Sequence, residues 1–561
     1  MALAPPASLD PVATRSRLRR PLRGVAVLAL VAALALCLAA CGGSGSGGRE
    51  GGTLEATISA FPDYLDPGLS HTAEGFTAMY DTYIPLLTYA HADGKAGSKV
   101  VPGLAKAMPK ISDGGRTYTL QLRPGLQYSD GKPVEASDFT HAIERVFKLN
   151  SNGSFFYEDI VGAERFAKTK SGGIAGIETD DKSGRITIHL TAPRGTFDNE
   201  LGLPFAAPVP ASTPDHDLSA DPPPATGPYA IVASHPGVGW EYARNPRWAA
   251  NNAKLLPQIP SGHVDKIDVR VVRNASTQVN EVEAGKSDWM MSTLPSDRYS
   301  EVKEKYEGSQ FRVEPAVSTY FFWMNTKRAP FSDPKVRQAV NYAIDPAALE
   351  RIYAGQMVGT QQVLPPGMPG YRKLELYPHD LAKAKRLVRE ANPSDREITV
   401  WTNNENPNDE AGAYYQDVLK QLGFDVELKV LNADSYFTVI GNLSTPNLDT
   451  GFGNWFEDYP HPNDFFQPLL DGESIAPTNN ANFAQIDDPA LDRRIAELGE
   501  EPLGPSQEAG YAALDREYMQ QAPWAPFGTS TTSTFVSSAI DLDKVVVNPT
   551  FYQDLTSFQF K

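Results

Sequence analysis

The chain has 561 residues, of which 68 are acidic and 51 are Lys or Arg, so its formal net charge is -17 at pH 7. This charge argues against a nucleic-acid binder, which needs a basic surface to neutralise phosphates. Hydrophobic residues make up 41% of the chain, enough for a sizeable core, and the length suits about two to four domains. Two cysteines are too few for a disulfide framework or a cysteine-based zinc site.

The N-terminus has the pattern of an export signal. Five arginines between positions 15 and 23 precede an apolar run at 25–40, which is shorter than the roughly 20 residues that a membrane span needs. Cys41 directly follows Leu38-Ala39-Ala40, which resembles the lipobox of bacterial lipoproteins. In that interpretation Cys41 becomes the mature N-terminus and carries the lipid. The alternative is an ordinary signal peptide followed by a chance cysteine.

A run of only Gly and Ser, residues 42–48, follows this cysteine and is typical of a flexible tether. We therefore predict a lipoprotein signal peptide at 1–40 and a tether at 41–52. The remaining chain is expected to be an exported body, lipid-anchored to the outer face of the cytoplasmic membrane.

Several strands and helices follow from hydrophobic periodicity. Alternation of apolar and polar residues predicts strands at 118–122, 186–190 and 267–271. Apolar residues at helical spacing predict one helix capped by Ser137 and another capped by Asp333, with a proline at its first position.

A β–α–β unit is predicted near the middle of the second half of the chain. A strand at 398–401 precedes a helix at 411–422, Gly423 suits a left-handed helix end, and a strand follows at 424–430. Such a crossover favours neighbouring parallel strands, so the fold class is α/β.

Enzyme motifs are incomplete throughout the sequence. It contains no His-Glu-x-x-His zinc motif and no Gly-x-Ser-x-Gly nucleophile turn. Gly285-Lys286-Ser287 resembles the end of a phosphate-binding loop, but Asn280 replaces the required glycine. The nine histidines are scattered, and none pairs at helical spacing. We therefore expect no catalysis, no cofactor and no metal site.

Eight short motifs, in a fixed order, carry a family resemblance. They are Leu65-Asp66-Pro67, Val101–Ala105, 118–147, Thr226–Tyr229, Arg244-Asn245-Pro246, Asn325–Asp345, Leu364–Gly367 and Ala522-Pro523-Trp524. Together they resemble the extracellular solute-binding proteins of bacterial ABC importers, in the family of dipeptide- and oligopeptide-binding proteins. The likeness extends over nearly the whole mature chain.

The resemblance implies a two-lobed α/β fold of the periplasmic-binding-protein type. Hinge crossover strands join the lobes, and an extra subdomain is inserted in lobe one. Transferred to this sequence, lobe one is 53–319 plus 529–561, its inserted subdomain is about 86–195, and lobe two is 320–528.

The resemblance also implies a function. The protein is expected to capture short peptides by lobe closure and to deliver them to the permease and ATPase of an ABC importer. It is expected to be a monomer that is held at the membrane by its lipid anchor, with no nucleic-acid partner. Within the same fold, the ligand could instead be an oligosaccharide, an opine, haem or a nickel chelate. Two further alternatives are a peptide-sensing receptor without import and a surface hydrolase, although no nucleophile–base motif supports the latter.

One segment, Gly453–Pro460, matches the ligand-binding motif of peptide-binding relatives. In them a tryptophan, followed three residues later by an acid, lies in the cleft, and the acid pairs with the α-amino group of the ligand. Trp455 and Asp458 match this spacing, with Asn454 and Tyr459 beside them. A carboxylate suits this role because an ammonium group taken out of water needs a charged partner. The adjacent Glu457 is the alternative partner.

Two further segments are candidates for ligand contact. The first, Ser318–Asn325, would present Tyr320, Trp323 and Asn325 from an extended strand that pairs with a peptide main chain. The second contributes Tyr157 from the inserted subdomain. For each aromatic ring, the alternative is simple packing in the core.

Overall fold

The structure, a computed structural model, describes residues 48–561 apart from the side chain of Asp434. The predicted signal peptide at 1–40 and the predicted lipid attachment at Cys41 lie outside the described residues. Within the described part of the chain, no helix has the length and apolar character needed to cross a membrane.

The tether was predicted at 41–52, but its last residues, from Arg49 onward, belong to the folded body. The backbone N–H of Arg49 donates to the carbonyl of Phe560, and that of Gly51 donates to the carbonyl of His263, each at 2.8 Å. The tether is thus shorter at its C-terminal end than its glycine content suggests.

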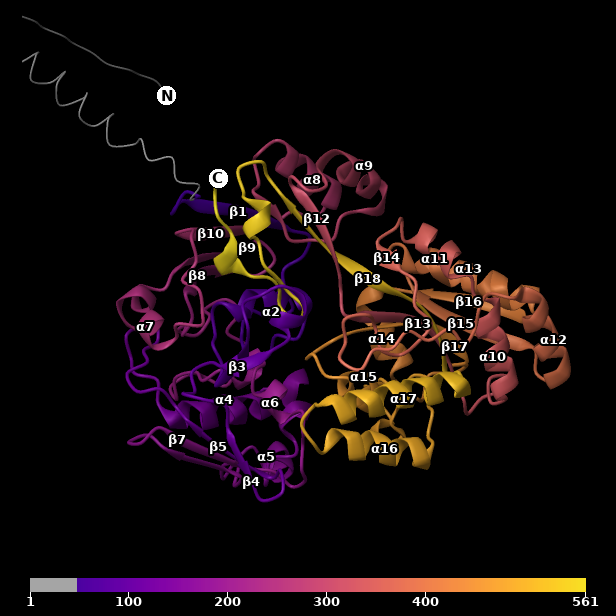
Figure 1. The fold of residues 1–561 in the computed structure, drawn as a ribbon, viewed down its shortest axis with the longest axis horizontal. Helices are drawn as coiled ribbons and strands as arrows, with labels where there is room; N and C mark the ends of the chain where they lie inside the picture. Colours follow the sequence, from indigo (N-terminus) through magenta and orange to yellow (C-terminus); the bar gives the residue numbers. More distant parts are fainter. Residues whose placement is uncertain (1–47) are drawn as a thin grey trace, which may run out of the picture. The chain divides into compact units, whose positions relative to one another are not determined.

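One mixed sheet of 12 strands runs through the body (Figure 1). In spatial order its main path is β16 (Asp425–Leu431), β15 (Glu397–Asn403), β17 (Thr450–Phe456), β13 (Ser318–Met324), β18 (Trp524–Val536), β11 (Trp289–Met290), β1 (Thr53–Ile58), β10 (Lys266–Val271), β9 (Gly239–Arg244) and β8 (Tyr229–His235). The remaining two strands, β12 (Phe311–Pro315) and β14 (Met357–Val358), pair with β18.

The long strand β18 joins the two halves of this sheet. Its first residues pair antiparallel with β13, and its last residues pair with β12 and β11. Strand β12 ends at Pro315 and β13 begins at Ser318, so the chain crosses between the halves beside β18. These two adjacent crossings are the hinge strands of a two-lobed fold, as predicted (Figure 1).

The first lobe contains β1 and β8–β12, with a smaller sheet below them. That sheet has the order β4 (Lys110–Ser112), β5 (Thr117–Gln121), β7 (Arg185–His189), β6 (Ile177–Asp180). Two short pairs are β2 (Leu87–Tyr89) with β3 (Val100–Pro102), and β19 (Val547–Asn548) with β20 (Tyr552–Gln553). The helices are α2 (Ala73–Tyr80), α3 (Gly94–Gly97), α4 (Ala136–Lys148), α5 (Ala163–Thr169), α6 (Phe197–Glu200), α7 (Ala253–Leu255), α8 (Ala275–Glu283) and α9 (Ser296–Tyr306).

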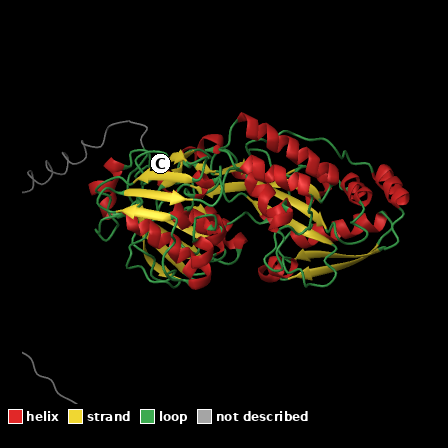
Figure 2. Cartoon of the chain, turned by 90° about the horizontal axis from the view of Figure 1, so that it is seen from below, coloured by secondary structure: helices red, strands yellow, loops and turns green. Residues whose placement is uncertain are grey.

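The second lobe contains β13–β17 and helices that lie around these strands and against one another (Figure 2). These helices are α10 (Pro334–Ala343), α11 (Pro346–Ile352), α12 (Leu381–Ala391), α13 (Asn408–Gln421), α14 (Ala433–Ile440), α15 (Asn463–Leu470), α16 (Pro489–Gly499) and α17 (Pro505–Gln521). Strands β15 and β16, which precede and follow α13 in the chain, pair in parallel. Gly423, after the end of α13, has a φ of +95°. The predicted β–α–β unit is therefore confirmed.

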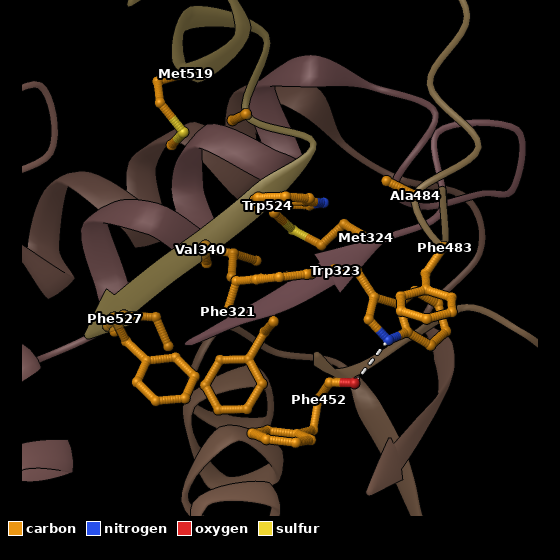
Figure 3. Packing of buried hydrophobic residues seen from close by; sticks show 14 of the residues in the cluster. Phe321, Trp323, Met324, Val340, Phe452, Phe483, Ala484, Met519, Trp524 and Phe527 are labelled. Atoms are coloured by element: carbon orange, nitrogen blue, oxygen red, sulfur yellow. Dashed lines mark hydrogen bonds between the residues drawn. The ribbon is translucent and has the colours of Figure 1, made fainter. Parts of the chain in front are cut away.

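Aromatic residues of β13 fill the core of the second lobe (Figure 3). The ring of Phe321 stacks on Trp524 with 3.7 Å between centroids, and Phe322 stacks on Tyr415 at 4.0 Å. The indole N–H of Trp323 donates to the carbonyl of Phe452 at 3.0 Å. A partnered N–H is what allows a tryptophan to be buried in this way.

The two predicted helix caps have different outcomes. Asp333 caps α10 by accepting from the backbone N–H of Lys335, as expected. The cap at Ser137 is wrong: α4 begins at Ala136, so the cap is Glu135, two residues earlier. The carboxylate of Asp138 accepts from the backbone N–H of Glu135 at 3.0 Å. The hydroxyl of Ser137 instead donates to Asp181.

A buried ion pair holds the segment that leads to the cavity described below. The guanidinium of Arg145, on α4, donates to both carboxylate oxygens of Asp66 at 2.6 and 2.5 Å, and neither side chain is more than 1% exposed. Asp66 also accepts from the backbone N–H groups of Gly68 and Leu218. The first motif of the family resemblance is therefore a structural anchor.

Replacing Asp66 with Asn should lower the free energy of unfolding by about 3 kcal/mol, because Arg145 then stays buried without a counter-charge. Urea unfolding followed by circular dichroism measures this loss. The matched control is Glu164→Gln, which removes an exposed helical pair with Lys168 and should leave the urea midpoint unchanged. An unchanged midpoint in Asp66→Asn would contradict the anchoring role.

Candidate ligand-binding site

A cavity of about 1300 Å³ lies between the two lobes. The first lobe contributes the start of α2, Met291 and residues 293–297, and the second contributes 405–408, 454–456 and Asp458. The crossing strands supply Tyr320 and Ser530–Thr532. Most drug-sized ligands occupy about 300–1,000 Å³, so this cavity has room for a short peptide.

Polar contacts join the lobes around the cavity. The pairs are His71 with Asp458 at 3.1 Å, Ser296 with Asn406 at 3.2 Å, Thr550 with Glu457 at 3.1 Å, and the backbone N–H of Gly195 with the carbonyl of Gly499 at 2.7 Å. In each pair the first residue belongs to the first lobe and the second to the second lobe. The structure is therefore in a closed arrangement.

Asp458 occupies a turn whose shape is fixed by a second buried acid. Strand β17 ends at Phe456, and one carboxylate oxygen of Asp464, on α15, accepts from the backbone N–H of Asp458 at 2.9 Å and from the indole of Trp455 at 3.3 Å. The Asp458 Oδ1 atom bonds to the ring of His71, whereas Oδ2 is buried and has no hydrogen-bond partner within the described residues.

The structure separates the roles of the two adjacent acids. Glu457 does not line the cavity, and it accepts a hydrogen bond from the Thr550 hydroxyl. Burial raises the pKa of Glu457 to about 8, so this side chain holds a proton at neutral pH. Burial, reinforced by the nearby charge of Asp458, also raises the pKa of Asp464 well above its usual range. Of the two candidate partners for a ligand amine, Asp458 is the one that lines the cavity.

His71 is a part of the site that its sequence context does not reveal. It lies against the rings of Phe76, Phe156 and Phe205, with centroids 5.6 to 6.0 Å away. Burial lowers the pKa of His71, but the negative charge of Asp458 and their hydrogen bond outweigh burial, and the net pKa is raised. The sequence alone gives only an isolated histidine after the Leu65-Asp66-Pro67 motif.

Four of the eight predicted contact residues line the cavity: Asp458, Trp455, Asn454 and Tyr320. Tyr320 and Asn454 are direct neighbours across the β13–β17 pair, so both side chains lie on one face of the sheet. The predicted pairing of β13 with a peptide main chain does not fit, because β13 already has β17 on one side and β18 on the other.

The other four predicted contact residues, Tyr459, Trp323, Asn325 and Tyr157, do not line the cavity. Trp323 packs in the second-lobe core on the opposite face of β13 from Tyr320. The Asn325 amide donates to the carbonyl of Leu448, and the Tyr157 hydroxyl donates to the carbonyl of Glu200. Each of these side chains is therefore held by the fold.

Tyr459 crosses the lobe boundary. Its chain position follows β17 of the second lobe, yet its ring packs into the first-lobe core, 6.1 Å from the ring of Phe156. Only 3% of Tyr459 is exposed. This residue helps to hold the lobes together and does not face the cavity.

The cavity wall also contains acids and aromatic rings to which no sequence motif points. Glu74, Asp297, Glu405, Tyr353 and Tyr552 all line it. They come from five separate segments, and no local motif distinguishes them from other acids and tyrosines of the chain.

The profile described as bacterial extracellular solute-binding proteins, family 5 Middle, matches residues 99–476. The chain belongs to this family. Its members are extracellular or periplasmic proteins that bind solutes and are not enzymes, which agrees with the predicted resemblance and with the two-lobed α/β fold.

Individual relatives of this family 5 protein have different ligands in their names. Probable di/tripeptide-binding protein 5 of Pseudomonas aeruginosa is 26% identical over 492 residues, covering 82% of this chain and 87% of that protein. Heme-binding protein A of Haemophilus influenzae is 26% identical over 511 residues, covering 85% and 86%. The solved structure of clavulanic acid biosynthesis oligopeptide binding protein 2 has a TM-score of 0.84 at 25% identity and covers 91% and 96%.

The histidine–aspartate pair makes closure dependent on pH. Closure raises the pKa of His71 above its ordinary value of 6.5. The pair therefore stabilises the closed arrangement fully at a pH below 6.5, and this stabilisation is lost as the pH rises through the raised pKa. Nuclear magnetic resonance titration should show His71 with a pKa above 6.5, and Asp458→Asn should lower it. The exposed His235, on the edge strand β8, serves as the internal control. A His71 pKa that does not respond to Asp458→Asn would contradict the pairing.

Proposed function

We propose that this solute-binding protein captures short peptides between its lobes and delivers them to the permease of an ABC importer. The observation that carries the proposal is Asp458 at the cavity wall, with one oxygen held by His71 and the other without a partner. A buried carboxylate oxygen of this kind suits the α-amino group of a peptide. The di/tripeptide-binding and oligopeptide-binding relatives support the same ligand class.

The end of β17 offers a main-chain partner for the ligand. Strand β15 pairs with β17 only at Thr450 and Gly451, whereas β13 pairs with its whole length. One edge of the remaining residues therefore has no partner strand, and Asn454, Trp455 and Phe456 line the cavity. An extended peptide would add there as a short strand, with its amino group at Asp458.

Closure of the two lobes distinguishes the ligand-bound protein from the free protein, and it needs no covalent step. A ligand that touches both lobes binds the closed arrangement more tightly than the open one, which is what shifts the population. We assign lobe one to 53–319 plus 529–561 and lobe two to 320–528, with an inserted subdomain at about 86–195. The second-lobe core supports this division, since all of its buried residues except Val317 lie within 320–528.

We further propose that the mature protein is a lipid-anchored monomer. Cys41 would carry the lipid, and the Gly- and Ser-rich residues after it would let the body reach the permease, raising their effective concentration.

Asp458→Asn should weaken binding of a free-amine tripeptide by about 1.5–3 kcal/mol, because a charge-assisted hydrogen bond is lost. Calorimetry with the same tripeptide carrying an N-terminal acetyl group is the control, and there the substitution should have little effect. Equal losses for both peptides would eliminate Asp458 as the amine partner.

Cys41→Ala should release the protein from the membrane fraction, because no lipid can then be attached. Fractionation followed by immunoblotting measures the distribution, and Ser44→Ala, in the predicted tether, is the matched control. Retention of Cys41→Ala in the membrane would refute the lipid anchor.

A further inference from the structure

The charges that line the cavity are strongly one-sided. The acidic lining residues are Glu74, Asp297, Glu405 and Asp458, and none of the described lining residues is Lys or Arg. The one basic side chain is His71, which is engaged by Asp458. This leaves three further carboxylates on the wall of a site whose family membership already makes it a ligand site.

Two of these acids belong to opposite lobes. Glu74 lies in the first turn of α2 in the first lobe, and Glu405 lies in the loop between β15 and α13 in the second. Neither carboxylate has a Lys, Arg or His partner among the described residues, and Glu74 accepts only from its own backbone N–H. Both residues line the same cavity, from opposite lobes. Burial raises the pKa of Glu405, and the negative charge of Glu74 raises it further.

The local surroundings of the two acids differ. The helix dipole favours a carboxylate in the first turn of α2, but burial outweighs it and raises the pKa of Glu74. Glu405 has no such helix. Its loop is nevertheless held in place, because the Ser296 hydroxyl donates to Asn406 across the lobes and the hydroxyl of Tyr353 donates to Asn408 at 2.8 Å.

The closed arrangement places like charges from both lobes on the wall of one cavity, which costs free energy unless a cation binds there. A ligand cation would therefore bind the closed arrangement more tightly than the open one. Aromatic rings surround this part of the cavity: Tyr320 and Tyr353 experience the charge of Glu405, and Tyr552 experiences that of Glu74. Tyrosine faces beside carboxylates favour a guanidinium or an ammonium group.

We propose that the preferred peptides carry a lysine or arginine side chain, and that this side chain lies between Glu74 and Glu405. The proposal rests on the peptide-binding function above and adds a second cation site to the one at Asp458. Peptides with an acidic side chain are disfavoured by the same two carboxylates.

Calorimetry on the purified protein tests the preference with trialanine and with tripeptides that have Lys, Arg or Glu at the second or third position. The best Lys or Arg peptide should bind about tenfold or more tightly than trialanine, and the Glu peptides more weakly. If trialanine binds as tightly as every basic peptide, this inference is overturned while the peptide-binding function stands. If no peptide binds, both are overturned.

The double variant Glu74→Gln/Glu405→Gln should remove the preference for basic peptides and leave the affinity for trialanine within about twofold. The matched control is Glu410→Gln, which removes one exposed negative charge on α13 outside the cavity and should retain the preference. An equal loss for trialanine and the basic peptides would overturn the proposal, because it would indicate a structural role.

The salt dependence of the unaltered protein provides a second readout that does not rely on a folded variant. Raising the NaCl concentration from 0.05 to about 0.5 M should weaken the best basic peptide several-fold more than trialanine, since salt screens charge pairs. Equal salt dependence for the two peptides would overturn the charge-based selection.

Discussion

The two adjacent strand crossings between the lobes are the constraint on which the rest of the structure depends. The chain leaves the first lobe between β12 and β13 and returns along β18. Both covalent connections between the lobes therefore lie side by side. Each lobe has its own hydrophobic core, which lets it move as a unit. The ligand cavity lies at this boundary, where small rotations about the crossings change its walls most.

The electrostatics of the cavity follow from burial at that boundary. Glu457 holds a proton and burial raises the pKa of Asp464, which limits the repulsion in a turn that contains three acids. Asp458 has a hydrogen-bond partner from the other lobe in His71, whose pKa it raises. A single carboxylate thus connects the closed arrangement with the pH, and in the proposed function it also binds the amine of the ligand.

Hydrophobic periodicity and helix-capping residues predicted the elements that depend on neighbouring residues in the sequence. The β–α–β unit with Gly423 and the helix capped by Asp333 follow from periodicity and capping, and both are present. Ser137 failed as a cap because Asp138 satisfies the helix start and Asp181 engages the serine. The family resemblance supplied the two-lobed topology, which periodicity cannot give.

The cavity was predictable only where a motif points to it. Asp458 and Trp455 follow from such a motif, whereas Trp323 packs in the core. Both faces of β13 are buried, so alternation does not say which of its side chains reach the cavity. Glu74 and Glu405 are separated by more than half of the chain, so only the fold brings them to one wall. Contacts of that kind have no local signature.

The measurement that tests lobe closure most directly is the distance between the lobes with and without peptide. In a protein that begins at residue 42, both native cysteines are absent, so Lys254→Cys on α7 and Lys385→Cys on α12 provide unique sites for spin labels. Pulsed electron paramagnetic resonance should show a broad distribution that a saturating short peptide converts to a single shorter distance. A distribution that peptide leaves unchanged would contradict capture by closure.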